Sequence, residues 1–199
     1  MRTTAVLVLA GALVLAACSA LEGNGNVDTE NRTVAEFDAV DADNGVTVVL
    51  TVDPTVSGDV VLEVTTDSNL QEFLTTTVSG TELSVSTDRN GGVTPSGPFD
   101  VSATVAIVRA ASADNGAEVR LLGAGGDVTL SADGGADIDA QALEAINVIV
   151  NADNGAKISV CATGTVTGNA NNGADVTVLC GGTFGAVETS DGGTISSAS

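Results

Sequence analysis

Apolar and polar residues alternate along most of the chain after residue 27, which is the pattern of strands with one buried face. Val and Thr, both strand-forming residues, dominate the clearest alternating segments. These predicted strands cover residues 46–52, 60–64, 83–85 and 101–108. We therefore expect an all-β protein.

Two stretches interrupt the alternation. Residues 68–75 predict one helical turn or a capping loop that buries Leu70, Phe73 and Leu74. Residues 88–98 are so rich in Gly and Pro that we predict an exposed loop with no strand in it.

A short turn of Asp, Asn and Gly recurs in the second half of the chain. A fixed period near 20 residues predicts stacked repeats, and the similar turn at residues 42–45 looks like an earlier coil. The glycines that set this period are 19, 20, 18 and 20 residues apart: Gly116, Gly135, Gly155, Gly173 and Gly193. We expect a ladder of stacked turns made by Asn44, Gly45, Asn115, Gly116, Gly134, Gly135, Asn154, Gly155, Asn172 and Gly173.

The positions that follow each turn glycine agree as well. One, three and five residues on, the side chains are apolar, and a period of two places them on one face, which we expect to be the interior. They are Ala117, Val119 and Leu121, then Ala136, Ile138 and Ala140, then Ala156, Ile158 and Val160, then Ala174, Val176 and Val178.

Two folds fit this pattern. Asn-Gly turns between alternating segments are hairpin signals, so an antiparallel β-sandwich is one candidate. In a single-stranded parallel β-helix, successive turns lie above one another at roughly 4.8 Å, so that like residues stack and side-chain amides can bond along the ladder. The shared turn sequence favours the β-helix, with coils of about 20 residues.

The N-terminus has the features of a targeting signal. Arg2 precedes an apolar run over residues 5–16, which is too short to span a bilayer but typical of a signal peptide. The run ends in Leu-Ala-Ala-Cys at residues 15–18, which resembles a bacterial lipobox. An ordinary secretory signal with an incidental Cys is the alternative.

The lipobox resemblance implies that residues 1–17 are removed and that Cys18 carries the lipid that anchors the protein to a membrane. Residues 18–26 are small, polar and Gly-rich, so we predict a flexible tether, with a folded domain over 27–199. The expected location is the cell envelope. This means the outer membrane in a Gram-negative host, or the outer face of the cell membrane in a Gram-positive one.

The amino-acid composition argues against several classes of function. With 26 acidic residues, six basic residues and a net charge of −20, the chain repels nucleic acid, whose phosphates need Lys and Arg. It has no His, and Lys157 is its single lysine, so most acid–base and nucleophilic schemes lack their usual groups. We predict no catalytic residue, no cofactor and no metal site.

The acidic turns invite a calcium interpretation. Residues 41–45 (Asp-Ala-Asp-Asn-Gly) place Gly at the fifth position and Val52 at the twelfth, where an EF-hand loop needs Gly at the sixth and Glu at the twelfth. We interpret Asp, Asn and Gly here as turn residues. Weak surface binding of calcium is the alternative.

Charged side chains are expected on the outer face of the coils. Stacking would place Arg120 beside Asp139, and Lys157 between Asp137 and Asp175. Such exposed pairs contribute at most about 1 kcal/mol, and we interpret them as aids to register and solubility. A polysaccharide-acting enzyme that uses a pair of these carboxylates is an alternative. It is disfavoured because clustered cations are missing.

Cys161 and Cys180 are 19 residues apart, which is one coil. Stacking would bring their backbones to roughly 5 Å, within disulfide range, although their offset by one position requires a bulge or a shifted turn. We predict a disulfide. Two small buried thiols are the alternative.

Three segments resemble the head GIN domain family, whose proteins are described as "putative auto-transporter adhesins". They contain Arg-Thr-Val-x-x-Phe at 32–37, Asn-Leu at 69–70 and Gly-Thr-x-Leu at 80–83, and the resemblance covers roughly residues 24–195. It implies a right-handed β-helix on a secreted or lipid-anchored bacterial surface protein, without catalytic residues. We therefore expect a non-catalytic adhesion module whose partner is a surface glycan or protein. A purely structural envelope protein is a further alternative.

Overall fold

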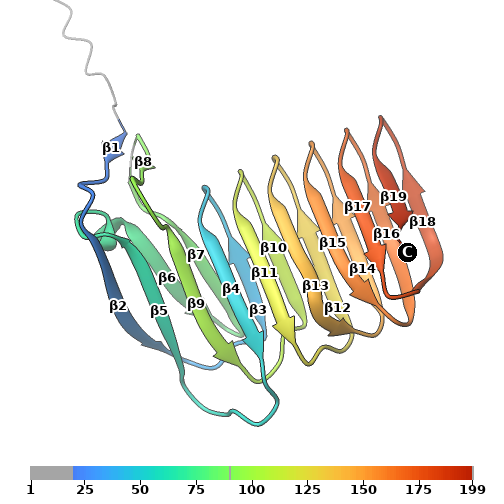
Figure 1. The fold of residues 1–199 in the computed structure, drawn as a ribbon, viewed down its shortest axis with the longest axis horizontal. Helices are drawn as coiled ribbons and strands as arrows, with labels where there is room; N and C mark the ends of the chain where they lie inside the picture. The colour runs from blue at the N-terminus through green and yellow to red at the C-terminus, as the bar shows by residue number, and fades with distance from the viewer. Residues whose placement is uncertain (1–19, 90, 199) are drawn as a thin grey trace, which may run out of the picture.

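The computed structural model describes residues 20–89 and 91–198. Most of their strands form two large sheets that lie face to face along the long axis of the molecule, and a third sheet has two strands (Figure 1). The nine-stranded sheet contains, in spatial order, β19 (Thr194–Ser197), β17 (Asp175–Leu179), β15 (Lys157–Ala162), β13 (Asp137–Ala145), β11 (Glu118–Gly123), β4 (Thr47–Val52), β9 (Asp100–Val105), β5 (Val60–Asp67) and β2 (Val27–Val34). The eight-stranded sheet contains β18 (Thr183–Thr189), β16 (Thr165–Ala170), β14 (Val148–Ala152), β12 (Val128–Ala132), β10 (Ala110–Ala113), β3 (Ala39–Ala42), β7 (Glu82–Thr87) and β6 (Leu74–Ser79).

From β9 to β19 the chain alternates between the two sheets, as it does from β3 to β4, so each of these coils contributes one strand to each sheet. Every strand pair between the coil of β3 and β4 and the coil of β18 and β19 is parallel. Antiparallel pairs occur at the N-terminal end, between β2 and β5, β5 and β9, and β6 and β7. The prediction of an all-β protein is confirmed, and the antiparallel sandwich is wrong for the repeated coils.

The predicted interior is confirmed. Val119 pairs with Val48 on one side and with Ile138 on the other, and all three side chains are fully buried. Each of the twelve positions predicted to face inward from the turns lies in this core. A slip of one residue would turn every side chain to the other face, so the burial pattern fixes the register of each coil.

The coils do not stack strictly in chain order. The coil of β3 and β4, over residues 39–52, lies directly against that of β10 and β11, over residues 110–123. The intervening chain forms the N-terminal end of the molecule, where β7 and β9 pair with β3 and β4.

The two interrupting stretches are partly as predicted. Leu70 and Leu74 are buried on either side of a 3-10 turn, η1 (Gln71–Phe73), whereas Phe73 is only half-buried and lies under the Arg89 guanidinium. The prediction of a loop without strand over residues 88–98 is wrong. It contains β8 (Val93–Thr94), which pairs in parallel with β1 (Leu21–Glu22).

Candidate functional site

Each repeated coil passes from the eight-stranded to the nine-stranded sheet through two residues with positive φ. This is the backbone of the type I′ turn, which Asn-Gly favours because both residues tolerate the left-handed region. The ten predicted turn residues all occupy these turns. The first position is Asn44, Asn115, Gly134, Asn154 or Asn172, with φ from 48° to 62°, and the second is Gly45, Gly116, Gly135, Gly155 or Gly173, with φ from 74° to 76°.

Side-chain amides connect neighbouring turns, as predicted. In each case Asn Nδ2 of one coil donates to the Asp carboxylate of the coil before it. The bonds are Asn115 to Asp43 at 2.8 Å, Asn154 to Asp133 at 2.7 Å and Asn172 to Asp153 at 2.6 Å. We call this series the amide ladder.

The amide ladder is broken at Gly134, which has no side chain to donate. Within residues 20–89 and 91–198, no hydrogen-bond donor reaches the carboxylate of Asp114, which occupies the place that Asp133 and Asp153 take in their own turns. Burial raises the pKa of Asp114, and the carboxylates of Asp133 and Asp43 raise it further. Asp114 therefore lies near two other negative carboxylates and has, among the described residues, no hydrogen-bond donor to offset its charge.

The last turn, between β18 and β19, lies one residue earlier than the spacing that ends at Gly193 predicts. Asp191 and Gly192 have φ of 47° and 82°, and Gly173 N donates to Asp191 O as Gly155 N donates to Asn172 O. Gly192, not Gly193, therefore continues the series. The sequence could not separate these two adjacent glycines.

Unlike Asp114, the turn carboxylates of Asp43, Asp133 and Asp153 accept hydrogen bonds from turn donors. Asp43 Oδ1 accepts from Asn44 N at 2.7 Å and from the amide of Asn115, and Asp43 Oδ2 accepts from Asn44 Nδ2 at 3.0 Å. In the described part of the chain, no group of three or more His, Cys, Asp or Glu residues is placed to hold a metal ion.

The outer face of the nine-stranded sheet is strongly charged. Arg120 lies beside Asp139 in the register, as predicted, but its ion pair is with Glu118 on its own strand, Nε to Oε1 at 2.6 Å. Residues two apart on a strand share a face, so Glu118 is within reach of Arg120 and takes the direct ion pair. This contact raises the pKa of the guanidinium, and the Asp139 carboxylate also raises it.

Lys157 lies between Asp137 and Asp175, as predicted. Burial raises the pKa of Asp137 and so does Glu118, whereas the ammonium of Lys157 lowers it. These alternating charges agree with a role in register and solubility, and they do not converge on a point where a substrate could react.

The outer face of the eight-stranded sheet is different. One row of side chains crosses all eight strands, and most of its members are small, neutral and polar. This polar row is Thr77, Ser84, Asp41, Ser112, Ser131, Asn151, Asn169 and Glu188. Burial raises the pKa of Asp41, and Asp114, Glu82 and Asp43 raise it further.

A shallow hollow of about 270 Å³ lies on this side of the molecule. The guanidinium of Arg109 lines it and is paired with Asp38, Nε to Oδ2 at 3.2 Å. The other lining residues include Asp127, Thr129, Asn147, Ile149 and Thr167. A flat face with one shallow hollow suits extended polar contacts better than an enclosed small-molecule site.

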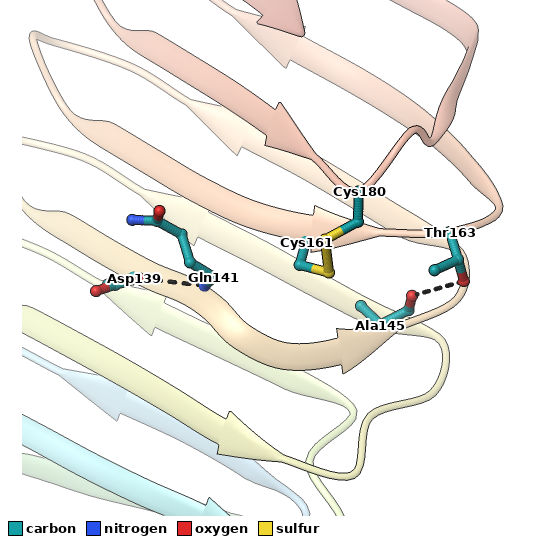
Figure 2. Close-up of a disulfide and its surroundings, with 6 residues drawn as sticks. All are labelled: Asp139, Gln141, Ala145, Cys161, Thr163 and Cys180. Carbon is teal, nitrogen blue, oxygen red and sulfur yellow. Dashed lines mark hydrogen bonds between the residues drawn. A yellow bond between two sulfur atoms is a disulfide. The ribbon is translucent and has the colours of Figure 1, made fainter. Parts of the chain in front are cut away.

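The predicted disulfide is present, linking Cys161 and Cys180 with a Cα–Cα distance of 5.1 Å (Figure 2). Cys161 pairs in register with Leu179, so Cys180 lies one position beyond its partner. A shifted turn, in which Cys180 has a φ of 68°, accommodates this offset of one residue.

Asp67, the most buried carboxylate of the described residues, could not be identified from the sequence. Its Oδ1 accepts from Ser96 Oγ at 2.6 Å and from Gly25 N at 2.7 Å, and its Oδ2 accepts from Ser96 N at 2.8 Å. The hydrogen bonds from Ser96, followed by that from Gly25, lower the pKa of Asp67. Its partners lie 42 and 29 residues away, so no local pattern could reveal them.

Asp67 also explains why the predicted flexible tether is wrong for residues 21–26. Leu21 and Glu22 form β1, Gly25 binds Asp67, and Asn24 N donates to Asn69 Oδ1 at 3.0 Å. Cys18, the predicted lipidation site, lies outside the described residues. Within those residues, no helix has the length and apolar character needed to cross a bilayer.

Residues 92–182 match the family model described as "Putative auto-transporter adhesin, head GIN domain". The match confirms the resemblance inferred from the sequence, on a region that includes four of the turns. No curated protein matches the chain.

A solved structure shares the fold at low sequence identity, and two others are similar with lower TM-scores. A Bacteroides fragilis protein described as a "putative adhesin" superposes with a TM-score of 0.50 at 15% identity, covering 89% of this chain and 100% of that one. A "putative lipid binding protein" of Parabacteroides distasonis gives 0.46 at 14% identity, covering 91% of this chain and 100% of that one. A "putative adhesin" of Parabacteroides merdae gives 0.44 at 12% identity with the same coverage. At such identities the likeness concerns the fold alone.

Proposed function

Since residues 92–182 carry the head GIN domain, we propose that the protein is a non-catalytic adhesion module of the bacterial cell envelope, with the outer face of the eight-stranded sheet as its contact surface. This proposal rests on the polar row. Its six central members are half-buried in the face, so their positions are set by neighbouring strands rather than by flexible loops.

The dimensions of the polar row suit an extended polymer. Eight strands at a spacing of about 4.8 Å give a row roughly 34 Å long. Hydroxyl and amide groups both donate and accept hydrogen bonds, which matches the hydroxyl-rich surface of a glycan chain or the backbone of an extended protein segment. The charged nine-stranded face would repel most anionic surfaces, which leaves the polar face as the side that can approach one.

Matched substitutions on the two faces test the contact surface. Asn151→Lys with Asn169→Lys changes the polar row on β14 and β16, whereas Ser159→Lys with Thr177→Lys makes the same charge change on β15 and β17 of the same coils. Both variants would be compared with the unchanged protein in saturation binding to arrays of envelope polysaccharides and to whole bacterial cells. We expect the first variant to lose at least about tenfold in affinity, as for two lost hydrogen-bonding positions, and the second to bind as before. Equal effects, or no saturable binding at micromolar concentration, would contradict the proposal.

We also propose that Cys18 is lipidated and holds the protein at the membrane, as its lipobox resemblance implies. Stable anchoring would follow from several acyl chains on one residue. Cys18→Ala should move the protein from the membrane fraction to the soluble fraction, with its melting temperature unchanged. Retention of the variant in the membrane fraction would count against a lipid anchor.

For the fold itself, we infer that the coils wind as a right-handed parallel β-helix flattened into two sheets. Parallel strands joined by a crossover are right-handed in about 98% of cases, because strand twist favours that hand. The parallel pairing of successive coils supports this inference, and a crystal structure with left-handed coils would overturn it.

A further inference from the structure

The two ends of the stacked coils differ in how their edge strands are protected. At the N-terminal end, the edge strand β2 carries Asp28, Glu30 and Arg32. The Arg32 guanidinium reaches the other sheet, where it donates to Leu74 O and, at 2.9 Å, to Gln71 O. Charged side chains and such a covering contact are devices that prevent an edge from pairing with another chain.

The C-terminal end lacks these devices. β18 and β19 are the last strands of their sheets, and together they carry a single charged residue, Glu188. Asp191 is the one other acidic residue after position 180, out of 26 in the chain. A second molecule could therefore approach this end against far less repulsion than the net charge of −20 would suggest.

The interior of the coils is open at this end. Val166 is 0% exposed, whereas Phe184, which continues the same row in the last coil, is 41% exposed. Val176 is fully buried, and its successor Ile195 is only partly so. Other interior rows end in Thr189 and Ser197, so an apolar centre is surrounded by polar residues, as in protein–protein interfaces.

We propose that this end is a dimerisation surface, on which β18 and β19 of one molecule pair in antiparallel fashion with the same edges of a second copy. The two strands run in opposite directions, so a two-fold axis at this end produces antiparallel pairs and brings the Phe184 side chains together. Such an interface is self-complementary and closes after two molecules, because the charged N-terminal edge does not offer a matching surface.

The size of the surface sets the expected strength. β18 has seven residues and β19 has four, so they span about 23 and 13 Å; with a separation of about 10 Å and their flanking side chains, they give roughly 400 Å² for each copy. The total of about 800 Å² is below that of a standard stable interface, so we expect a reversible dimer with a dissociation constant on the order of micromolar.

Sedimentation of the protein carrying Cys18→Ala, over a range of concentrations, tests the proposal. We expect the mass to rise from monomer to dimer, and Phe184→Glu to shift the dissociation constant by at least about tenfold because it places two carboxylates against each other. The control is Ile149→Glu, which changes an isoleucine that is 49% exposed on the outer face and should leave association unchanged.

Hydrogen exchange on the unchanged protein supplies a measurement that does not depend on a variant. The amides of β18 and β19 should exchange more slowly as the concentration rises, while those of β2 and β6 should not change. A monomer at all concentrations, an equal effect of both variants, protection of the β2 edge, or open-ended polymers would each overturn the closed dimer.

Discussion

Restoring the missing rung of the amide ladder should stabilise the protein. Position 134 has the same positive φ as the four turn asparagines, at 60°, so Asn can adopt its backbone conformation. The Nδ2 of Asn in Gly134→Asn would lie where it can donate to the carboxylate of Asp114, as Asn154 donates to Asp133. The substitution thus supplies the one donor that the column of carboxylates lacks.

The magnitude follows from three contributions. Reduced freedom of the unfolded chain stabilises by about 0.5 kcal/mol, and an exposed hydrogen bond to a carboxylate by about 1 kcal/mol. The left-handed backbone costs about 1 kcal/mol or less for Asn. A Cβ at residue 134 would lie 3.2 Å from Asn115 N, which is a tight contact that any side chain shares. We expect a net gain of about 0.5 kcal/mol.

Gly134→Ala is the matched control, because it pays the same backbone and contact costs without offering an amide. The two variants should therefore differ by at least about 1 kcal/mol in the free energy of unfolding, or about 2–4 °C in melting temperature. Chemical denaturation at pH 7 and NMR titration of the Asp114 carboxyl give independent readouts, and the pKa of Asp114 should fall in Gly134→Asn alone. Equal stabilities of the two variants would show that the amide ladder contributes nothing to stability.

Three further predictions concern the stability of the coils. Replacing Cys161 and Cys180 together by Ser removes the crosslink between residues 19 apart and should lower the free energy of unfolding by about 3 kcal/mol relative to the disulfide-bonded protein. Urea denaturation measures this, and the reduced form of the unchanged protein should match the variant. Ile158→Ala removes a fully buried side chain and should cost about 3–4 kcal/mol. Ile149→Ala, at a position 49% exposed on β14 of the other sheet, should cost less than about 1 kcal/mol; the reverse order would mean that the register is wrong by one residue. Stability should rise as the pH falls from 7, because the carboxyls with a raised pKa bind their proton more tightly when folded. Below their ordinary value of 3.8 it should fall, because the lowered pKa of Asp67 makes protonation favour the unfolded chain. Thermal melts between pH 2 and 8 check this, and a steady decline from pH 7 downwards would contradict it.

The repeated coils could be predicted from the sequence because their signals are local. Two residues in the left-handed region require Asn or Gly, and a period of two places the apolar residues that follow on one face. The same logic placed Cys161 and Cys180 within reach, since one period separates them. In each case the chemistry that identifies the element lies within a few residues of it.

The N-terminal end could not be predicted in this way. The sequence indicates that residues 42–45 belong to a coil, but not that 57 residues intervene before the chain returns to stack against it over 110–123. Asp67 has no local signature either, because its stability as a buried carboxylate depends on Ser96 and Gly25 rather than on a pattern in its own strand. The small, polar and Gly-rich composition therefore predicted a flexible tether where residues 24 and 25 are held by long-range hydrogen bonds.

The two outer faces show how one repeat can serve two purposes. The turn and the inward residues fix the register, so they leave the outward positions free to differ between the sheets. On β11, β13, β15 and β17 those positions include Glu118, Arg120, Asp137, Asp139, Lys157 and Asp175, whose charges favour solubility. On β10, β12, β14 and β16 the members of the polar row are Ser and Asn at a regular spacing, with no charge to repel a partner. A surface of this kind gains affinity from many modest hydrogen bonds repeated along the partner. Only an extended partner can make all of these bonds at once, and we therefore propose that the ligand is extended.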